Sequence, residues 1–63
     1  MSLGENIKRY RNKVGISQDK LSKLVDVTAA TIYRIEKNKV DPKFSLVERI
    51  AKVLKVKVDD LLR

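Results

Sequence analysis

The 63-residue sequence contains neither cysteine nor histidine. The absence of cysteine excludes a disulfide framework and a cysteine-ligated zinc site, and the absence of histidine removes the commonest general base and metal ligand. A catalytic pocket of roughly 300 Å³ or more is hard to enclose in so short a chain. We therefore expect neither an enzyme nor a protein that holds a metal, a cofactor or a small-molecule ligand.

Long hydrophobic runs are also missing. No apolar stretch approaches the ~20 residues that a membrane span needs, and no signal-like segment opens the chain. There is no linker, repeat or low-complexity segment, so we treat residues 1–63 as a single domain. Hydrophobic residues nevertheless make up 43% of the chain, which is too many for a disordered basic tail. The expected class is a folded cytoplasmic protein without a membrane partner.

What the sequence has in excess is positive charge. It contains 15 Lys and Arg against 8 Asp and Glu, so the formal net charge is +7. A balance of this kind indicates a polyanionic partner, and nucleic acid is the first to consider. Because the only aromatic residues are two tyrosines and one phenylalanine, little is available for stacking the bases of single-stranded RNA.

Apolar residues recur with a helical period nearly throughout the chain, and polar residues mark where helices start. Ser2 and Glu5 have the spacing of a capping box at the start of the first helix, and Gly15 is the expected left-handed stop. Ser17 and Thr28 are the expected N-caps of the next two helices. The pattern predicts an all-α fold, a compact bundle of five short helices.

The later elements follow from the same signals. We expect a third helix over Ala29–Lys37, a left-handed Asn38, a loop over Lys39–Lys43, a fourth helix over Phe44–Leu54 and a closing helical turn near Asp59–Leu62. The alternation at 56–58 is also compatible with a short strand, but no second strand is available to pair with it. The side chains expected to face the core are Leu3, Ile7, Tyr10, Val14, Leu21, Leu24, Val25, Ile32, Ile35, Phe44, Val47, Ile50, Ala51 and Leu54.

The most informative stretch is 18–37, where two short helices are joined by a turn of about four residues. Leu21, Val27, Ile32 and Ile35 are placed to bury the joint. This is a helix-turn-helix arrangement. Its second helix is narrow enough to enter a DNA major groove about 12 Å wide, and its N-terminal amides suit a phosphate.

The whole chain resembles the lambda-repressor-like, Cro/repressor-type (XRE-family) helix-turn-helix DNA-binding domain. The resemblance covers essentially residues 3–63. The matching segments are IKRYRNKVGISQDKL, VTAATIYRIEKNK, DPKFSLVERIAKVLKV and VDDLL. Two departures are conservative: Ser22 stands where the family usually has Ala, and Asp26 stands where it usually has Gly. Lys43 and Lys57 replace the family's usual Ser or Thr caps, so we expect the last two helices to start less firmly.

The resemblance implies a set of DNA contacts from the second helix, the third helix and the loop that follows. The predicted residues are Gln18, Thr28, Ala29, Ala30, Thr31, Tyr33, Arg34, Lys37, Asn38, Lys39 and Lys43. Arg34 is the best candidate for base readout because its guanidinium matches guanine O6 and N7, although an arginine there can also bind phosphate or stay solvated. By periodicity Ala30 points outward, with partial burial as the alternative. Because alanines stand where hydrogen-bonding side chains are common, readout should lean on apolar contacts, water and DNA shape.

Two further groups of residues have structural interpretations. The family pairs an arginine of the first helix with the glutamate that ends the third, and Arg11 and Glu36 match these positions. We interpret them as an ion pair that fixes the third helix on the first. Surplus apolar residues on the last two helices predict either the edge of the core or a symmetric dimer interface, at Leu46, Val53, Val58, Leu61 and Leu62.

The leading hypothesis is a sequence-specific regulator of transcription, most simply a repressor or autoregulator, that binds double-stranded DNA as a homodimer on a near-palindromic operator. Such a protein would be associated with the nucleoid when bound. The alternative is a protein-interaction module with the same fold, antitoxin-like or coactivator-bridge-like, which binds DNA weakly or without sequence preference. Equal affinity for operator and random duplex would distinguish the second from the first.

Overall fold

Five α-helices follow one another along residues 2–63, the part of the chain that this computed structural model describes. Their bounds are Leu3–Val14 (α1), Gln18–Leu24 (α2), Ala29–Glu36 (α3), Phe44–Leu54 (α4) and Val58–Leu62 (α5). No strand occurs within these residues, so the predicted all-α class is confirmed and the alternation at 56–58 leads into a helix. The third helix ends one residue earlier than expected, with Lys37 as its C-cap. No helix of this stretch is both long and apolar enough to cross a membrane.

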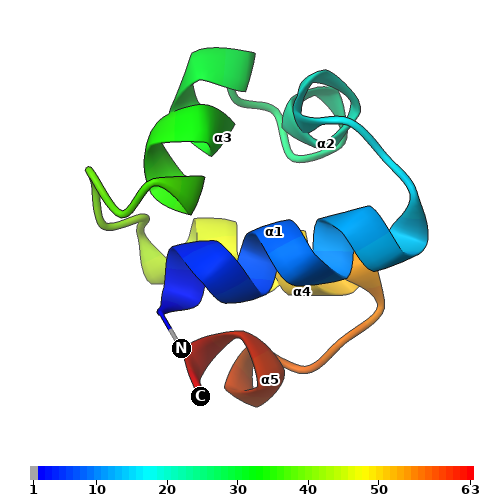
Figure 1. The fold of residues 1–63 in the computed structure, drawn as a ribbon, viewed down its shortest axis with the longest axis vertical. Coiled ribbons are helices and arrows are strands. Elements are labelled where there is room, and N and C mark those ends of the chain that lie inside the picture. The colour runs from blue at the N-terminus through cyan, green and yellow to red at the C-terminus, as the bar shows by residue number, and fades with distance from the viewer. Residues whose placement is uncertain (1) are drawn as a thin grey trace.

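The helices pack in a simple order. α1 and α4 contact each other in the middle of the domain, α2 and α3 lie on one side of them, and α5 lies on the other (Figure 1). α2 and α3 contact each other most extensively, and α1 touches α3, α4 and α5. α1 is therefore the helix on which the other parts of the fold are assembled.

The first three helix starts are capped as predicted. Ser2 accepts a hydrogen bond from the Glu5 amide while the Glu5 carboxylate accepts one from the Ser2 amide, which completes the capping box. The hydroxyls of Ser17 and Thr28 likewise accept hydrogen bonds from backbone amides in the first turns of α2 and α3. Gly15 ends α1 with φ 85°.

The last two helices start differently. Lys43 and Lys57 occupy the N-cap positions of α4 and α5, and neither side chain accepts a capping hydrogen bond. At α5 the Asp60 carboxylate accepts a hydrogen bond from the Lys57 amide at 3.0 Å, so only one half of a capping box is present. Both N-caps therefore lack the side-chain hydrogen bond of a Ser or Thr, as expected, and a less firm start of these helices stays a prediction.

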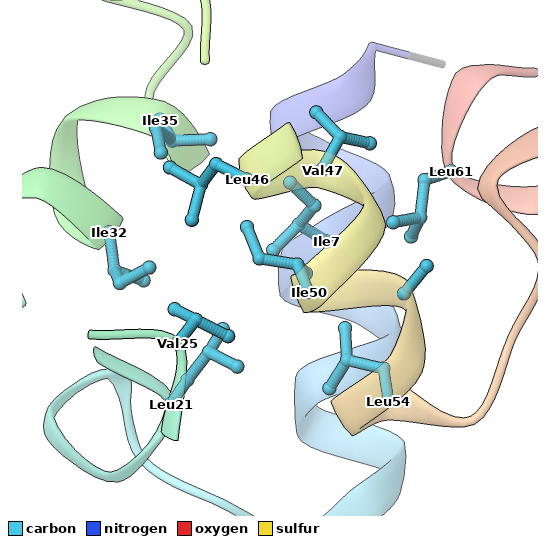
Figure 2. Close-up of a cluster of buried hydrophobic side chains, with 11 residues drawn as sticks. Ile7, Leu21, Val25, Ile32, Ile35, Leu46, Val47, Ile50, Leu54 and Leu61 are labelled. Carbon is cyan, nitrogen blue, oxygen red and sulfur yellow. The ribbon is translucent and has the colours of Figure 1, made fainter. Parts of the chain in front are cut away.

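One hydrophobic core joins all five helices. Figure 2 shows side chains from each of them pointing toward one another. The core residues are Ile7, Leu21, Val25, Ile32, Ile35, Leu46, Val47, Ile50, Ala51, Leu54 and Leu61.

Three residues expected in the core are instead exposed. Val14, Leu24 and Phe44 are 48%, 50% and 61% accessible. Each is the last or first residue of its helix. The periodicity identifies the face of a helix that is buried, but it does not show how far along the helix the buried part extends.

The expected dimer surface needs a related correction. Leu46 and Leu61 are 8% and 0% accessible within the single chain, so they belong to the core. Val53 and Val58 are half-buried and Leu62 is exposed. Only these three of the five residues retain apolar surface that a second molecule can cover.

Candidate nucleic-acid interface

The turn between α2 and α3 has the geometry that a helix-turn-helix requires. Asp26 adopts φ 61°, a left-handed conformation that aspartate tolerates better than most residues with a side chain. The Val27 amide donates to the Ser22 carbonyl at 3.0 Å and closes the turn. Ser22 is 2% accessible, and its hydroxyl donates to the Asp19 carbonyl at 2.6 Å. The position therefore requires a small side chain, and serine satisfies its own hydroxyl there.

α3 separates its side chains into an inner and an outer face. Ile32 and Ile35 are buried, whereas Ala30, Tyr33 and Arg34 are exposed. Ala30 therefore points outward, as its periodicity predicts, and is not partly buried. Ala29 and Thr31 are half-buried at the border between the faces. The outer face thus presents one guanidinium beside small and aromatic groups.

The start of α3 is exposed, with its polar side chains bonded to each other. The Thr28 and Thr31 hydroxyls lie 2.9 Å apart, and the Thr28 hydroxyl also accepts from the Thr31 amide at 3.1 Å. The predicted role of Thr28 as the N-cap of α3 is confirmed. At the other end of the helix, the Lys37 ammonium lies 5.8 Å from the centre of the Tyr33 ring, within the range of a cation–π contact.

Glu36, the last residue of α3, is bonded to two other helices. Arg11 of α1 donates to both carboxylate oxygens, at 2.7 and 3.0 Å, and Gln18 of α2 donates its amide to one of them at 3.0 Å. The side chains of Arg11 and Glu36 are 9% and 2% accessible, and Arg11 also donates to the Ile16 carbonyl. The predicted structural ion pair is present, and it fixes the end of α3 against α1 and α2.

The link to Gln18 connects a predicted DNA contact to the buried pair. Because a carboxylate only accepts hydrogen bonds, the Gln18 side chain must turn its NH₂ group toward Glu36. Its carbonyl oxygen and its second N–H remain for another partner. The pattern of residue types alone did not indicate this connection, since the two residues lie 18 positions apart.

The loop after α3 carries the exposed lysines. Lys37, Lys39 and Lys43 are all exposed, and Lys43 lies at the far end of the loop as the first residue before α4. Asn38 is also exposed, but unlike the three lysines it is held by hydrogen bonds of its side chain. It adopts φ 58° as predicted, and both ends of its side-chain amide are bonded to residues at the start of α1.

The surroundings of α3 offer contacts for an anion but no group of ligands for a metal. Among residues 2–63 there is no cluster of three or more carboxylates that could hold a metal ion. On α3 and in the loop that joins it to α4, the exposed charged side chains are Arg34, Lys37, Lys39, Asp41 and Lys43, and cations predominate among them.

Comparison with known proteins identifies the fold. Residues 7–61 match the family model described as helix-turn-helix. The chain belongs to this family. It is 38% identical over 55 residues to an HTH-type transcriptional regulator of Archaeoglobus fulgidus, which covers 87% of this chain and 79% of that protein. It is 40% identical over 55 residues to the HTH-type transcriptional regulator MJ0272 of Methanocaldococcus jannaschii, with 87% and 83% covered.

Solved structures show the same architecture. The P22 c2 repressor in complex with a synthetic operator superimposes with a TM-score of 0.94 at 30% identity, covering 100% of this chain and 96% of that one. SinR in complex with DNA superimposes with a TM-score of 0.91 at 32% identity, covering 97% and 98%. The lambda-repressor-like, XRE-type assignment is confirmed. Family and fold are those of DNA-binding helix-turn-helix transcriptional regulators and not those of an enzyme.

Proposed function

We propose that this protein is a sequence-specific DNA-binding regulator, acting as a repressor or autoregulator, that inserts α3 into the major groove as one half of a homodimer. The observation that carries the proposal is the exposed outer face of α3, which a capped start and a buried ion pair hold in place. Two structural neighbours were solved with a synthetic operator and with DNA, and they support duplex DNA as the partner.

Base readout is proposed to centre on Arg34. Its guanidinium is exposed on the outer face of α3 and can donate two parallel hydrogen bonds to one guanine. The methyl groups of Ala29, Ala30 and Thr31 suit contact with a thymine methyl, and Tyr33 can pack on the sugar-phosphate backbone. With one strong hydrogen-bonding side chain on this face, the remaining specificity should come from water and DNA shape.

Phosphate contacts are proposed on both sides of the inserted helix. Lys37, Lys39 and Lys43 are exposed after α3, and Gln18 and Thr28 lie at the starts of α2 and α3. Amides at a helix start favour an anion, and each lysine that neutralises a phosphate releases a counterion. Binding should therefore weaken steeply as the salt concentration rises.

A homodimer is proposed because two copies of α3 would read a near-palindromic operator in major grooves about 34 Å apart. Apolar surface for a second copy remains at Phe44 and Leu62, which are 61% and 54% accessible, and at the half-buried Val53 and Val58. Sedimentation equilibrium with and without operator tests this directly. Leu62→Glu should shift the protein toward monomer, and an unchanged mass would remove Leu62 from the interface.

The experiment for DNA reading starts with selection of bound duplexes from a random pool. Arg34→Ala should then reduce discrimination between the selected operator and random duplex by about 1–3 kcal/mol, measured by fluorescence anisotropy. Lys39→Ala is the matched control, because it should weaken both duplexes alike and lower the salt slope by about one unit. Equal affinity of the unchanged protein for operator and random duplex would contradict the proposal and favour the protein-interaction module.

A further inference from the structure

The start of α1 and the end of α3 approach each other more closely than any side chain would permit. Gly4, in the first turn of α1, is buried. A Cβ atom on this residue would lie 2.7 Å from the Glu36 carbonyl oxygen and still closer to that of Ile35. Both atoms belong to the backbone of α3, so they cannot move aside as a flexible side chain can. The glycine therefore permits direct backbone contact between the two helices.

Asn38 connects the same two helix ends through its side chain. The Gly4 amide donates to Asn38 Oδ1 at 3.1 Å, and Asn38 Nδ2 donates to the Ser2 hydroxyl at 2.9 Å. Because the Gly4 N–H is a donor, only the oxygen of the Asn38 amide can face it, and the NH₂ group must face Ser2. Asn38 thus acts as a second N-cap for α1, supplied from 34 residues away.

The Ser2 hydroxyl is fully occupied in this arrangement. It accepts from the Glu5 amide at 3.2 Å and from Asn38 Nδ2, and it lies 3.0 Å from the Glu5 carboxylate, to which it donates. The positive end of the α1 dipole also meets the carbonyls at the negative end of α3. The hydrogen bonds and the dipoles therefore favour the same placement of α3. We call Ser2, Gly4 and Asn38 the clasp.

The clasp and the Arg11–Glu36 pair attach α3 to α1 at two points. Gly4 and Arg11 are seven residues apart, which places them on one face of α1 at a separation of about 10 Å. Ile7 lies between them on that face and is fully buried. One attachment point would leave α3 free to pivot on the core, whereas two points fix its direction.

We propose that Asn38 is a positioning residue: through the clasp it sets the direction in which α3 is presented to DNA, and it governs sequence discrimination without reading a base. This inference rests on the proposed function and replaces the expectation that Asn38 contacts phosphate. A phosphate contact would affect every duplex equally. A change in the direction of α3 affects the operator more than random duplex, because only the operator depends on aligned base contacts.

Asn38→Gly tests this, because glycine keeps the left-handed backbone while it removes both side-chain hydrogen bonds. The ratio of operator affinity to random-duplex affinity should fall about fivefold. This loss corresponds to one net hydrogen bond, because of the two bonds removed the one to Ser2 is exposed and contributes little. In the DNA-free variant, the Gly4 amide should exchange faster with solvent. Circular dichroism checks that the variant is folded.

Asn38→Asp provides the conservative rescue. Aspartate tolerates the left-handed conformation, and its carboxylate can still accept the hydrogen bond from Gly4, although it cannot donate to the Ser2 hydroxyl as Asn38 does. This variant should keep the affinity ratio within about twofold of the unchanged protein and should keep the Gly4 amide protected, since that hydrogen bond is retained. Its added negative charge should weaken binding to both duplexes alike.

Three results would overturn the inference. The first is an equal loss of affinity for both duplexes in Asn38→Gly, which would make Asn38 a phosphate contact. The second is unchanged exchange of the Gly4 amide, and the third is an unchanged affinity ratio. A failure of the proposed function can be distinguished from a failure of this inference, because the unchanged protein would then show no preference for the selected operator at all.

Discussion

α3 and α4 of this domain are held by different kinds of contact. α5 resembles α3 in this respect, because the buried Asn6 of α1 donates to the Leu61 and Arg63 carbonyls at 2.9 and 2.8 Å. Arg11, Gln18, Asn38 and Glu36 join the first three helices through side-chain hydrogen bonds that cross from one helix to another. Among residues 2–63, no side-chain hydrogen bond joins α4 to another helix, and α4 is held by its apolar face. The helix proposed to read DNA is thus attached by directional contacts and its supporting helix by packing.

The difference follows from what each kind of contact specifies. Burial of apolar surface is proportional to area and has no preferred direction, so it brings helices together without fixing their angle. Hydrogen bonds weaken steeply away from linear geometry, so a few of them between two helices fix their relative direction. A helix whose direction sets base recognition needs the second kind of contact. A helix that only completes the core does not.

Removal of the buried carboxylate should produce the largest effect. Glu36→Ala leaves Arg11 buried without its partner, and we expect a loss of about 3–5 kcal/mol in the free energy of unfolding. That is a large part of the roughly 3–9 kcal/mol expected for a domain of this length. Urea denaturation measures it. Arg11→Met/Glu36→Leu is the control, because replacing both charges with apolar groups should recover most of the stability.

If Glu36→Ala lowers the free energy of unfolding by less than about 1 kcal/mol, the claim that directional contacts hold α3 is contradicted. A loss of that size is expected of a solvent-exposed ion pair. The double variant carries a second prediction. It should be stable but discriminate poorly between duplexes, since packing then replaces the directional contact.

Gly4→Ala should be the next largest effect. Replacing an ordinary exposed glycine within a helix by alanine raises the free energy of unfolding by about 1 kcal/mol. Here the added Cβ meets two backbone carbonyls, and we expect a net loss of about 1–3 kcal/mol by thermal denaturation. Asn12→Ala, at an exposed site of the same helix, is the matched control and should stabilise slightly. A stabilising Gly4→Ala would show that α1 and α3 can separate at no cost.

The sequence predicted much of the fold because the signals that define it are local. The Ser2, Ser17 and Thr28 caps and the left-handed Asn38 each depend on a few neighbouring residues, and all are present. The Arg11–Glu36 pair is not local, and it was predicted only because the family resemblance supplies it.

What the sequence left open depends on neighbours distant in the chain. Phe44 is exposed and Leu61 is buried, and a period of 3.6 residues does not encode this difference, because it depends on how the helices pack. The contact of Gly4 with α3 is indicated by one feature of the local sequence, a glycine in the first turn of a helix, where glycine is unfavourable. This feature indicates that another segment packs closely against Gly4, but it does not identify that segment as α3.

Adding a cap to α5 should test how much a local hydrogen bond at a helix start contributes, in a helix that Asn6 of α1 already holds at its other end. Lys57→Ser would supply the hydroxyl that the α5 N-cap lacks, opposite an Asp60 carboxylate that already accepts from the backbone. We expect a gain of about 0.5–1 kcal/mol in the free energy of unfolding, measured with urea. Lys52→Ser, an exposed site within α4 that loses the same charge, is the control and should not stabilise. If both variants raise the free energy of unfolding equally, the gain comes from removal of a lysine charge and not from the new cap.

The smallest expected effect is a dependence of the α1–α3 region on pH. The hydrogen bonds from the Ser2 amide, and then from its hydroxyl, lower the pKa of Glu5 below its ordinary value of 4.5. Because the pKa is lower in the folded state, Glu5 contributes stability above its unfolded pKa, and this contribution is lost as the pH falls through the folded pKa. Since the Ser2 hydroxyl donates to Glu5 and accepts from Asn38, we expect protonation of Glu5 to loosen the clasp.

The measurement compares the unchanged protein with Glu5→Gln, because eight acidic residues contribute to acid denaturation together. The difference in urea midpoint between the two proteins should be present at about pH 6 and should shrink by about pH 3. Over the same range the Gly4 amide should lose protection from exchange in the unchanged protein, whereas exchange in Glu5→Gln should follow only the intrinsic effect of pH. A difference in midpoint that stays constant with pH would show that the Glu5 carboxylate does not support the capping box, and the α1–α3 region would then depend on Arg11 and Glu36 for its charged contacts.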